Sequence, residues 1–193
     1  MKKPMSPLVI CILAIAGWQI GISLLSGAER NRKYAEAREY ADSVNKPFLV
    51  VGGPWGMNPL RVALGIPAHG CGDVCLDTDA EACHGCNTIE ADVRAIPFPD
   101  AHFGAVICPH VLEHMRTVVD AAQAAQELYR VADKVWILSP SKAYLMAWLH
   151  PDHYLWVRQE NDRVYIEPGP RYSGHETSMV LDFRAEEAFL SAT

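Results

Sequence analysis

Three glycines follow a short apolar run in this sequence, where a backbone turn could approach a ligand closely. The run PFLVV at residues 47–51 leads into the glycines Gly52, Gly53 and Gly56. Asn58-Pro59 then begins a predicted helix, with Asn as its N-cap and Pro in the first turn. A helix N-terminus favours a carboxylate or phosphate, and glycine lets the backbone come near it. The turn is therefore a candidate cofactor site, although it also suits a plain strand-to-helix connection.

Two carboxylates and a histidine follow later apolar runs. Asp77 and Asp92 end predicted strands, and His110 follows a third one. The carboxyl ends of parallel strands meet at one edge of a sheet, where open sheets bind their ligands. Asp77 is placed to accept hydrogen bonds from ribose hydroxyls, and Asp92 to face an exocyclic amine or another donor. Either carboxylate would also suit a helix cap or a solvated turn.

The elements that must position these residues alternate along the chain. Strands are predicted at 47–51, 72–77, 87–92, 104–108 and 134–139, with helices from residue 59 to about 65 and over 116–132. This order predicts an α/β fold with a doubly wound, mostly parallel sheet. Only seven residues, 80–86, separate the second and third strands, too few for a crossover helix. A hairpin around Asn161-Asp162 and a polar tail at 171–193 are expected to follow.

An uncharged 18-residue run, Leu8 to Leu25, precedes the domain. As a helix it spans about 27 Å, close to the thickness of a bilayer core, so we predict a transmembrane anchor at 1–28 and the lipid bilayer as a partner. A cleaved signal peptide ending near Ser26-Gly27-Ala28 is the alternative. Basic residues flank both ends, which leaves the orientation open. An amphipathic linker helix is predicted at 29–46.

Composition narrows the class of protein further. The chain has 193 residues, a formal net charge of −6 and 50% hydrophobic residues. A nucleic-acid partner is not expected, because there is no basic excess to neutralise phosphates. Six cysteines are too few for a small disulfide scaffold. The spacing of Gly17 and Gly21 would suit a partner helix in a membrane complex.

The segment from Asp92 to Met115 resembles the class I S-adenosylmethionine-dependent methyltransferases, in particular their type 11 branch. The matching residues are Asp92, Pro97, Phe98, Asp100, Phe103, Leu112, Glu113 and His114. The resemblance implies an abbreviated Rossmann-like domain over 47–170 and S-adenosylmethionine as cofactor. It places the cofactor across Gly52, Gly53, Gly56, Asp77 and Asp92, with His110 as the one candidate for a catalytic base. In this family Glu113 and His114 serve packing and loop shape.

The sequence departs from the family pattern at three positions. Val50 stands where the first motif has an acidic residue, and Pro54 stands at its middle glycine. Proline lacks an N–H and fixes φ, so this turn cannot follow the usual glycine path. Gly104 replaces a common aspartate. These departures are compatible with the fold, but they weaken the expected binding of the cofactor.

Two groups of residues have metal-ligand spacing, and we predict no metal site from either. His110 to His114 reads H-x-x-E-H, but a proline precedes it and the family pattern accounts for the same letters. Four cysteines with interleaved histidines form the second group: Cys71, Cys75, Cys83 and Cys86. Cys75 is expected to be a free core cysteine. In an extracytoplasmic domain, Cys83–Cys86 or Cys71–Cys83 disulfides would become plausible.

Two functions follow from these observations. The first is a membrane-anchored methyltransferase acting on a small or lipophilic substrate, with its domain in the cytoplasm, where the cofactor is made. The second is a catalytically inactive accessory subunit of a membrane complex, which an extracytoplasmic domain would favour. The aromatic stretches at 144–156 and 165–172 would then be docking surface, or else ordinary core.

Overall fold

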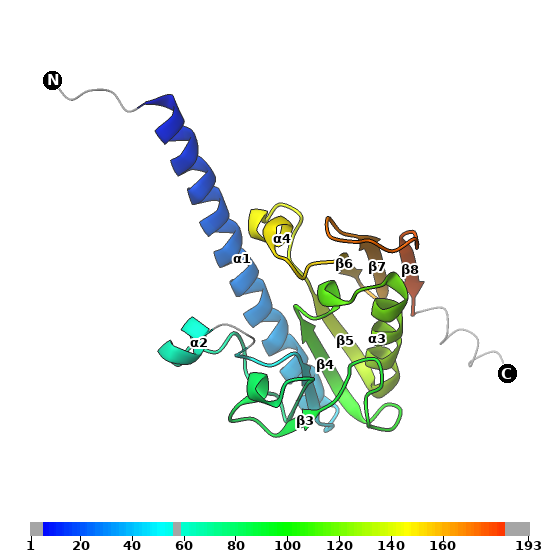
Figure 1. The fold of residues 1–193 in the computed structure, drawn as a ribbon. Helices are drawn as coiled ribbons and strands as arrows, with labels where there is room; N and C mark the ends of the chain where they lie inside the picture. The colour runs from blue at the N-terminus through cyan, green and yellow to red at the C-terminus, as the bar shows by residue number, and fades with distance from the viewer. Residues whose placement is uncertain (1–5, 56–58, 184–193) are drawn as a thin grey trace.

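A computed structural model describes residues 6–55 and 59–183, and its centre is a five-stranded parallel sheet (Figure 1). The strand order is β3-β2-β1-β4-β5. The strands are β1 (Phe48–Val51), β2 (Val74–Asp77), β3 (Thr88–Glu90), β4 (Phe103–Pro109) and β5 (Ala132–Leu138). One long helix covers one face and another helix covers the other, which confirms the predicted doubly wound α/β fold.

Strands β1 and β4 lie in the interior of the sheet, and their side chains are buried on both of its faces. The continuous apolar runs FLVV and FGAVICP are what such central parallel strands require. Leu49 lies opposite Val106 in the register of this pair. The strand order reverses between β1 and β4, so their carboxyl ends flank the crevice in which open sheets bind ligands.

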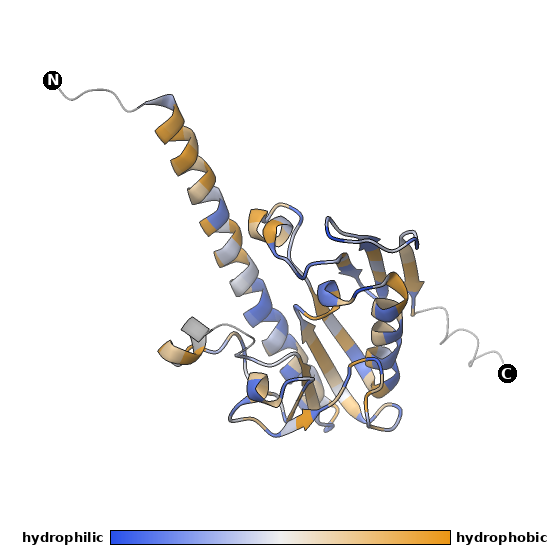
Figure 2. Ribbon diagram, in the orientation of Figure 1, coloured by the Kyte–Doolittle hydropathy of each residue, from blue (hydrophilic) through white to orange (hydrophobic). Residues whose placement is uncertain are grey.

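Helix α1 (Pro7–Ser43) joins the apolar N-terminal segment to the sheet without a break. Its 37 residues span about 55 Å. The predicted anchor and the predicted linker helix are thus one helix, which tolerates Gly27 at a cost of about 1 kcal/mol. The apolar N-terminal part is exposed all round and is long and apolar enough to cross a membrane (Figure 2).

The last turns of α1 pack on β1, β4 and β5 through small side chains. Ala37 and Ala41 are fully buried there. A Cβ placed on Gly104 would lie 3.0 Å from the Ala41 Cα and 2.7 Å from a Val44 methyl group. The helix therefore explains why glycine stands at this position, because the aspartate common in the family would collide with α1.

Helix α3 (Val118–Val131) covers the opposite face of the sheet. Its N-cap, Thr117, accepts a hydrogen bond from the Asp120 N–H, and its alanine-rich inner face is buried. The described residues also form four short helices, α2 (Pro59–Leu64), η1 (Ala80–Cys83), η2 (Leu112–His114) and α4 (Leu145–Leu149), and a hairpin of β6 (Leu155–Glu160) and β7 (Arg163–Pro168).

The hairpin turns at Asn161-Asp162, as predicted, and Asn161 adopts the left-handed conformation that such a turn needs (φ 54°). Gln159 of β6 connects it to the large sheet. Its amide donates to the Val135 carbonyl and accepts from the Ile137 N–H, both at 2.8 Å. The segment predicted as a polar tail contributes a further antiparallel strand, β8 (Met179–Asp182).

Replacing Gly104 by alanine should destabilise the domain, because the added methyl group must displace the end of α1. We expect a loss of about 1–3 kcal/mol in the free energy of unfolding, the usual cost of overpacking. Urea unfolding in detergent, followed by tryptophan fluorescence, measures it. Gly27→Ala is the matched control, since a Cβ there meets no atom within 4 Å. Equal stability of Gly104→Ala and the unmodified chain would contradict the packing described.

Candidate functional site

A cavity of about 920 Å³ lies at the carboxyl ends of β1, β2 and β4. Its lining includes four of the residues predicted for the cofactor: Gly52, Gly53, Asp77 and Asp92. His110, the predicted base, also lines it. Gly56, the fifth cofactor residue, lies outside the described residues. The fold thus gathers side chains from separate strand ends around one cavity, as the strand order predicted.

The two described glycines of the turn are closely approached by other parts of the protein. Gly52 has a φ of +92°, and a Cβ there would lie 2.6 Å from a Val111 methyl group. At Gly53, a Cβ would lie 2.1 Å from the Ala82 carbonyl oxygen. Helix η1 therefore lies directly on the turn, and Trp55 donates a backbone hydrogen bond to that same oxygen at 3.2 Å. Glycine is required here by contacts within the chain.

Two disulfides hold the segment that carries η1. Cys75 of β2 pairs with Cys83, and Cys71 pairs with Cys86. The expectation that Cys75 is a free core cysteine was wrong, although its side chain is buried. The pairing also differs from both bridges named from the sequence. One bridge joins β2 to η1, and the other joins the segments before β2 and β3, which the spacing along the chain does not reveal.

Asp77 is held by backbone hydrogen bonds at the end of β2. One carboxylate oxygen accepts from the Gly53 N–H at 2.7 Å, and the other accepts from the Asp79 N–H at 3.0 Å. Each carboxylate oxygen has a second lone pair, so Asp77 retains acceptor capacity toward the cavity. Its position agrees with the ribose-binding role expected for it, which stays a prediction.

Asp92 binds the neighbouring Arg94. The guanidinium contacts both carboxylate oxygens at 2.6–3.1 Å and also reaches Asp120 at 2.7 Å. These hydrogen bonds from Arg94 lower the pKa of Asp92, so the carboxyl is ionised at neutral pH. Any amine that binds Asp92 must share it with Arg94.

His110 is oriented by a buried carboxylate. Its backbone has a φ of +59°, and its Nδ1 lies 3.1 Å from Glu113, which also accepts from the Ser139 hydroxyl. Burial acts to raise the pKa of Glu113, but the hydrogen bond and the charge of His110 outweigh it and lower the pKa. An ionised Glu113 accepts a hydrogen bond from the Nδ1–H of His110, which leaves the lone pair of the neutral ring on Nε2.

The rest of the family motif fixes the shape of the cavity wall. Arg130 donates to the carbonyls of Ile96 and Phe98 and thereby holds the loop after Asp92. Glu113 is buried, which agrees with a packing role for the end of the motif. Residues 112–114 form a 3₁₀ helix, and His110 contacts Glu113 while His114 contacts two other histidines. The last three residues of H-x-x-E-H thus form a 3₁₀ helix and not the α-helix that would place residues four apart on one face.

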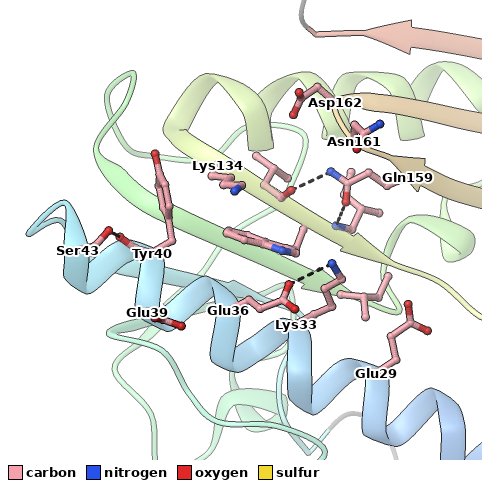
Figure 3. A pocket seen from close by; sticks show the side chains of 14 residues that line it. Glu29, Lys33, Glu36, Glu39, Tyr40, Ser43, Lys134, Gln159, Asn161 and Asp162 are labelled. Carbon is pink, nitrogen blue, oxygen red and sulfur yellow. Dashed lines mark hydrogen bonds and ion pairs between the residues drawn. The ribbon is translucent and has the colours of Figure 1, made fainter.

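A second hollow of about 810 Å³ lies between α1 and β5, away from the predicted site (Figure 3). Its lining is polar, and Lys33 pairs there with Glu36 at 3.2 Å. None of the residues predicted from the sequence lines it. The candidate site is therefore the cavity at the strand ends.

The central part of the chain is similar to a known protein family. Residues 70–134, about a third of the chain, match the family model described as a methyltransferase domain. The matched segment contains Asp77, Asp92 and His110, and the sheet order agrees with it. The match agrees with the resemblance of the segment from Asp92 to Met115 to the class I S-adenosylmethionine-dependent methyltransferases.

Solved structures resemble the chain only weakly. The amino pentose methyltransferase CalS10 from Micromonospora echinaspora, solved with bound S-adenosylmethionine, has 15% identity and a TM-score of 0.39, covering 100% of this chain and 90% of that one. The sugar N-methyltransferase KedS8 from Streptoalloteichus has 13% identity and a TM-score of 0.39, covering 86% and 66%. TM-scores this low add no argument of their own. No curated protein matches the chain.

One group of side chains at the cavity was not predicted from the sequence. His114, His150 and His153 lie together, with one ring nitrogen from each within 4.8 Å of the others. His114 and His150 line the cavity. The spacing His150-x-x-His153 was the available signal, but the sequence does not reveal that His114 approaches this pair.

The disulfides predict a defined pattern of thiol reactivity. Under denaturing, non-reducing conditions, iodoacetamide should label only Cys11 and Cys108, and four more thiols should react after reduction. Mass spectrometry of the intact chain counts the labels, and peptide mapping of the unreduced protein identifies the pairs. Labelling of all six cysteines without reduction, or bridges other than Cys71–Cys86 and Cys75–Cys83, would contradict the structure.

Proposed function

We propose that the chain is a membrane-anchored S-adenosylmethionine-dependent methyltransferase acting on a small, lipophilic substrate. The observation that carries the proposal is the cavity at the strand ends, which brings together Gly52, Gly53, Asp77 and Asp92. Asp77 and Asp92 lie in the segment that matches the methyltransferase-domain model. Its volume of about 920 Å³ is ample for a nucleoside cofactor beside a small substrate.

Three residues that line the cavity have a role in this proposal: Asp77, Asp92 and His110. Asp77 accepts hydrogen bonds from the ribose hydroxyls, and Asp92 accepts one from the adenine amine. S-adenosylmethionine supplies a methyl group on a positively charged sulfur, and this sulfur leaves as a neutral thioether. Holding the substrate in line with that methyl group supplies much of the catalysis. His110 Nε2 takes the proton that the substrate hydroxyl or amine loses, and Glu113 keeps the ring oriented.

The position of α4 supports a membrane-facing cavity. Leu145, Met146, Trp148 and Leu149 of α4 are all exposed apolar residues. Gln19 of α1 accepts a hydrogen bond from the Leu145 N–H at 2.8 Å, which fixes α4 beside the apolar part of the anchor (Figures 1 and 2). Gln19 lies six residues before Leu25, or about 9 Å into the apolar run. That depth is typical of elements that dip into the membrane interface.

The cavity opens beside these apolar elements. Its wall includes residues 150–152, which directly follow α4, and Arg30, which lies just beyond the apolar run of α1. Arg30 in turn donates to the Ala68 carbonyl, close to the exposed Leu64 and Ile66 at the end of α2. In this proposal the wall formed by Arg30 and residues 150–152 would place the cavity next to the bilayer that holds the anchor. This arrangement supports a lipophilic substrate.

A second candidate function is a catalytically inactive accessory subunit of a membrane complex. Two observations favour it specifically: the disulfides that hold η1 and the contact of Ala82 with the Gly53 turn. Structural disulfides persist in oxidising compartments, whereas the cofactor is made in the cytoplasm. The two candidates therefore differ in which side of the membrane holds the domain and in whether the cavity admits the cofactor.

Titration with S-adenosylhomocysteine tests the proposed function. We expect isothermal calorimetry of the oxidised chain in detergent to show micromolar binding. Asp77→Asn and Asp92→Asn should each weaken it about tenfold or more, because each removes a charged acceptor worth about 1.4 kcal/mol or more. Asp133→Asn is the matched control, since it changes a carboxylate at the opposite end of the sheet. Absence of heat at millimolar ligand, with a folded protein, would reject the enzyme in favour of the accessory subunit.

The membrane-facing cavity predicts that Trp148 contacts lipid. In vesicles that contain brominated phospholipids, the unmodified chain should lose more tryptophan fluorescence than Trp148→Phe, because bromine quenches only indoles in close contact. Trp136→Phe, which changes a buried indole on the sheet, serves as the control and should leave the quenched intensity unchanged. Equal quenched intensity in Trp148→Phe and the unmodified chain would place α4 in water.

A further inference from the structure

Three imidazole rings from separate elements meet at the wall of the cavity. His114 ends η2, His150 follows the last residue of α4, and His153 precedes β6. Their ring centroids are 4.3–5.5 Å apart, and one ring nitrogen from each lies within 4.8 Å of the other two. Imidazole is the most common ligand for transition metals in proteins. The cluster therefore offers three ligands of one type at one point.

Backbone carbonyls orient two of the rings. His114 Nδ1 lies 2.9 Å from the Asp152 carbonyl oxygen, and His153 Nδ1 lies 3.1 Å from the Ala147 carbonyl oxygen. A carbonyl can only accept, so each Nδ1 carries the proton and each Nε2 keeps its lone pair. Histidines that bind metals are held in this way, with the second ring nitrogen donating to a carbonyl or carboxylate.

The third ring is less constrained. His150 is exposed, and the Asp152 N–H donates to its Nδ1 over a long 3.3 Å. Ring contacts with the other two histidines are its remaining interactions given by the structure. A metal ion that binds this ring must displace that weak hydrogen bond. His153, by contrast, is nine-tenths buried, so it supplies a fixed point for the site.

We propose that His114, His150 and His153 bind a zinc ion, with its fourth coordination position left open. Three histidines with an open position are a ligand set of zinc sites that carry a water or substrate rather than of closed structural sites. The cysteines that would otherwise compete, Cys71, Cys75, Cys83 and Cys86, are paired in disulfides. Because His114 and His150 line the cavity, the ion lies at its wall. This site does not depend on the proposed methyl transfer.

Zinc and cobalt titrations of the oxidised full-length chain in detergent test the site. We expect calorimetry to give one zinc per chain, and Co²⁺ to give the visible absorption bands of a tetrahedral complex. His150→Gln should weaken zinc binding by at least about 10–100-fold, the loss usual even for an indirect ligand contact. His150 is exposed, so this variant is expected to fold. His114→Gln should abolish the cobalt bands.

The controls separate this site from chance binding by surface histidines. His102→Gln changes an exposed histidine outside the cluster and should bind zinc as the unmodified chain does. Zinc should also raise the thermal unfolding temperature of the unmodified chain and of His102→Gln, but not that of His150→Gln, because the ion binds only the folded cluster. Stoichiometry well below one, or equal zinc affinity in His150→Gln and His102→Gln, would overturn the proposal and leave the rings as packing groups.

Discussion

The close contact between the end of α1 and the sheet determines where the domain lies relative to the apolar N-terminal segment. Ala37 and Ala41 allow the helix to approach Gly104 so nearly that a Cβ there would be 3.0 Å from the helix backbone. Arg38 reinforces the contact through two hydrogen bonds to Asp73. Because α1 is continuous, this packing holds the strand ends at a set angle to the apolar segment. The cavity and α4 are thereby kept beside it.

The polar groups of the cavity already form hydrogen bonds within the chain. The Gly53 N–H donates a hydrogen bond to Asp77, and the Arg94 guanidinium donates hydrogen bonds to the Asp92 carboxylate. A ligand must share these groups, so its net gain is smaller than that of a site with open partners. The altered first motif, with Val50 and Pro54, is likewise expected to weaken cofactor binding. Helix η1 approaches the glycine turn closely, and the disulfides hold it there. The disulfide-linked segment is therefore part of the cavity wall.

Local sequence patterns predicted most of the fold, and contacts between distant segments explain the remainder. Buried strands read as apolar runs, and this placed Asp77, Asp92 and His110 at one edge of the sheet. The continuity of α1 was missed because Gly27 and its small neighbours resemble a boundary. The glycine at position 104 is explained only by its close contact with the end of α1. The disulfide pairs and the approach of His114 to His150 and His153 depend on segments that meet through tertiary packing, which the spacing along the chain does not reveal.

An experimental structure of the oxidised full-length chain with S-adenosylhomocysteine tests the account most directly. The account predicts that the ligand lies in the cavity at the strand ends, with its ribose on Asp77 and its adenine beside Asp92, while both disulfides remain intact and η1 stays on the glycine turn. An empty cavity at saturating ligand, or a ligand bound elsewhere on the chain, would contradict it.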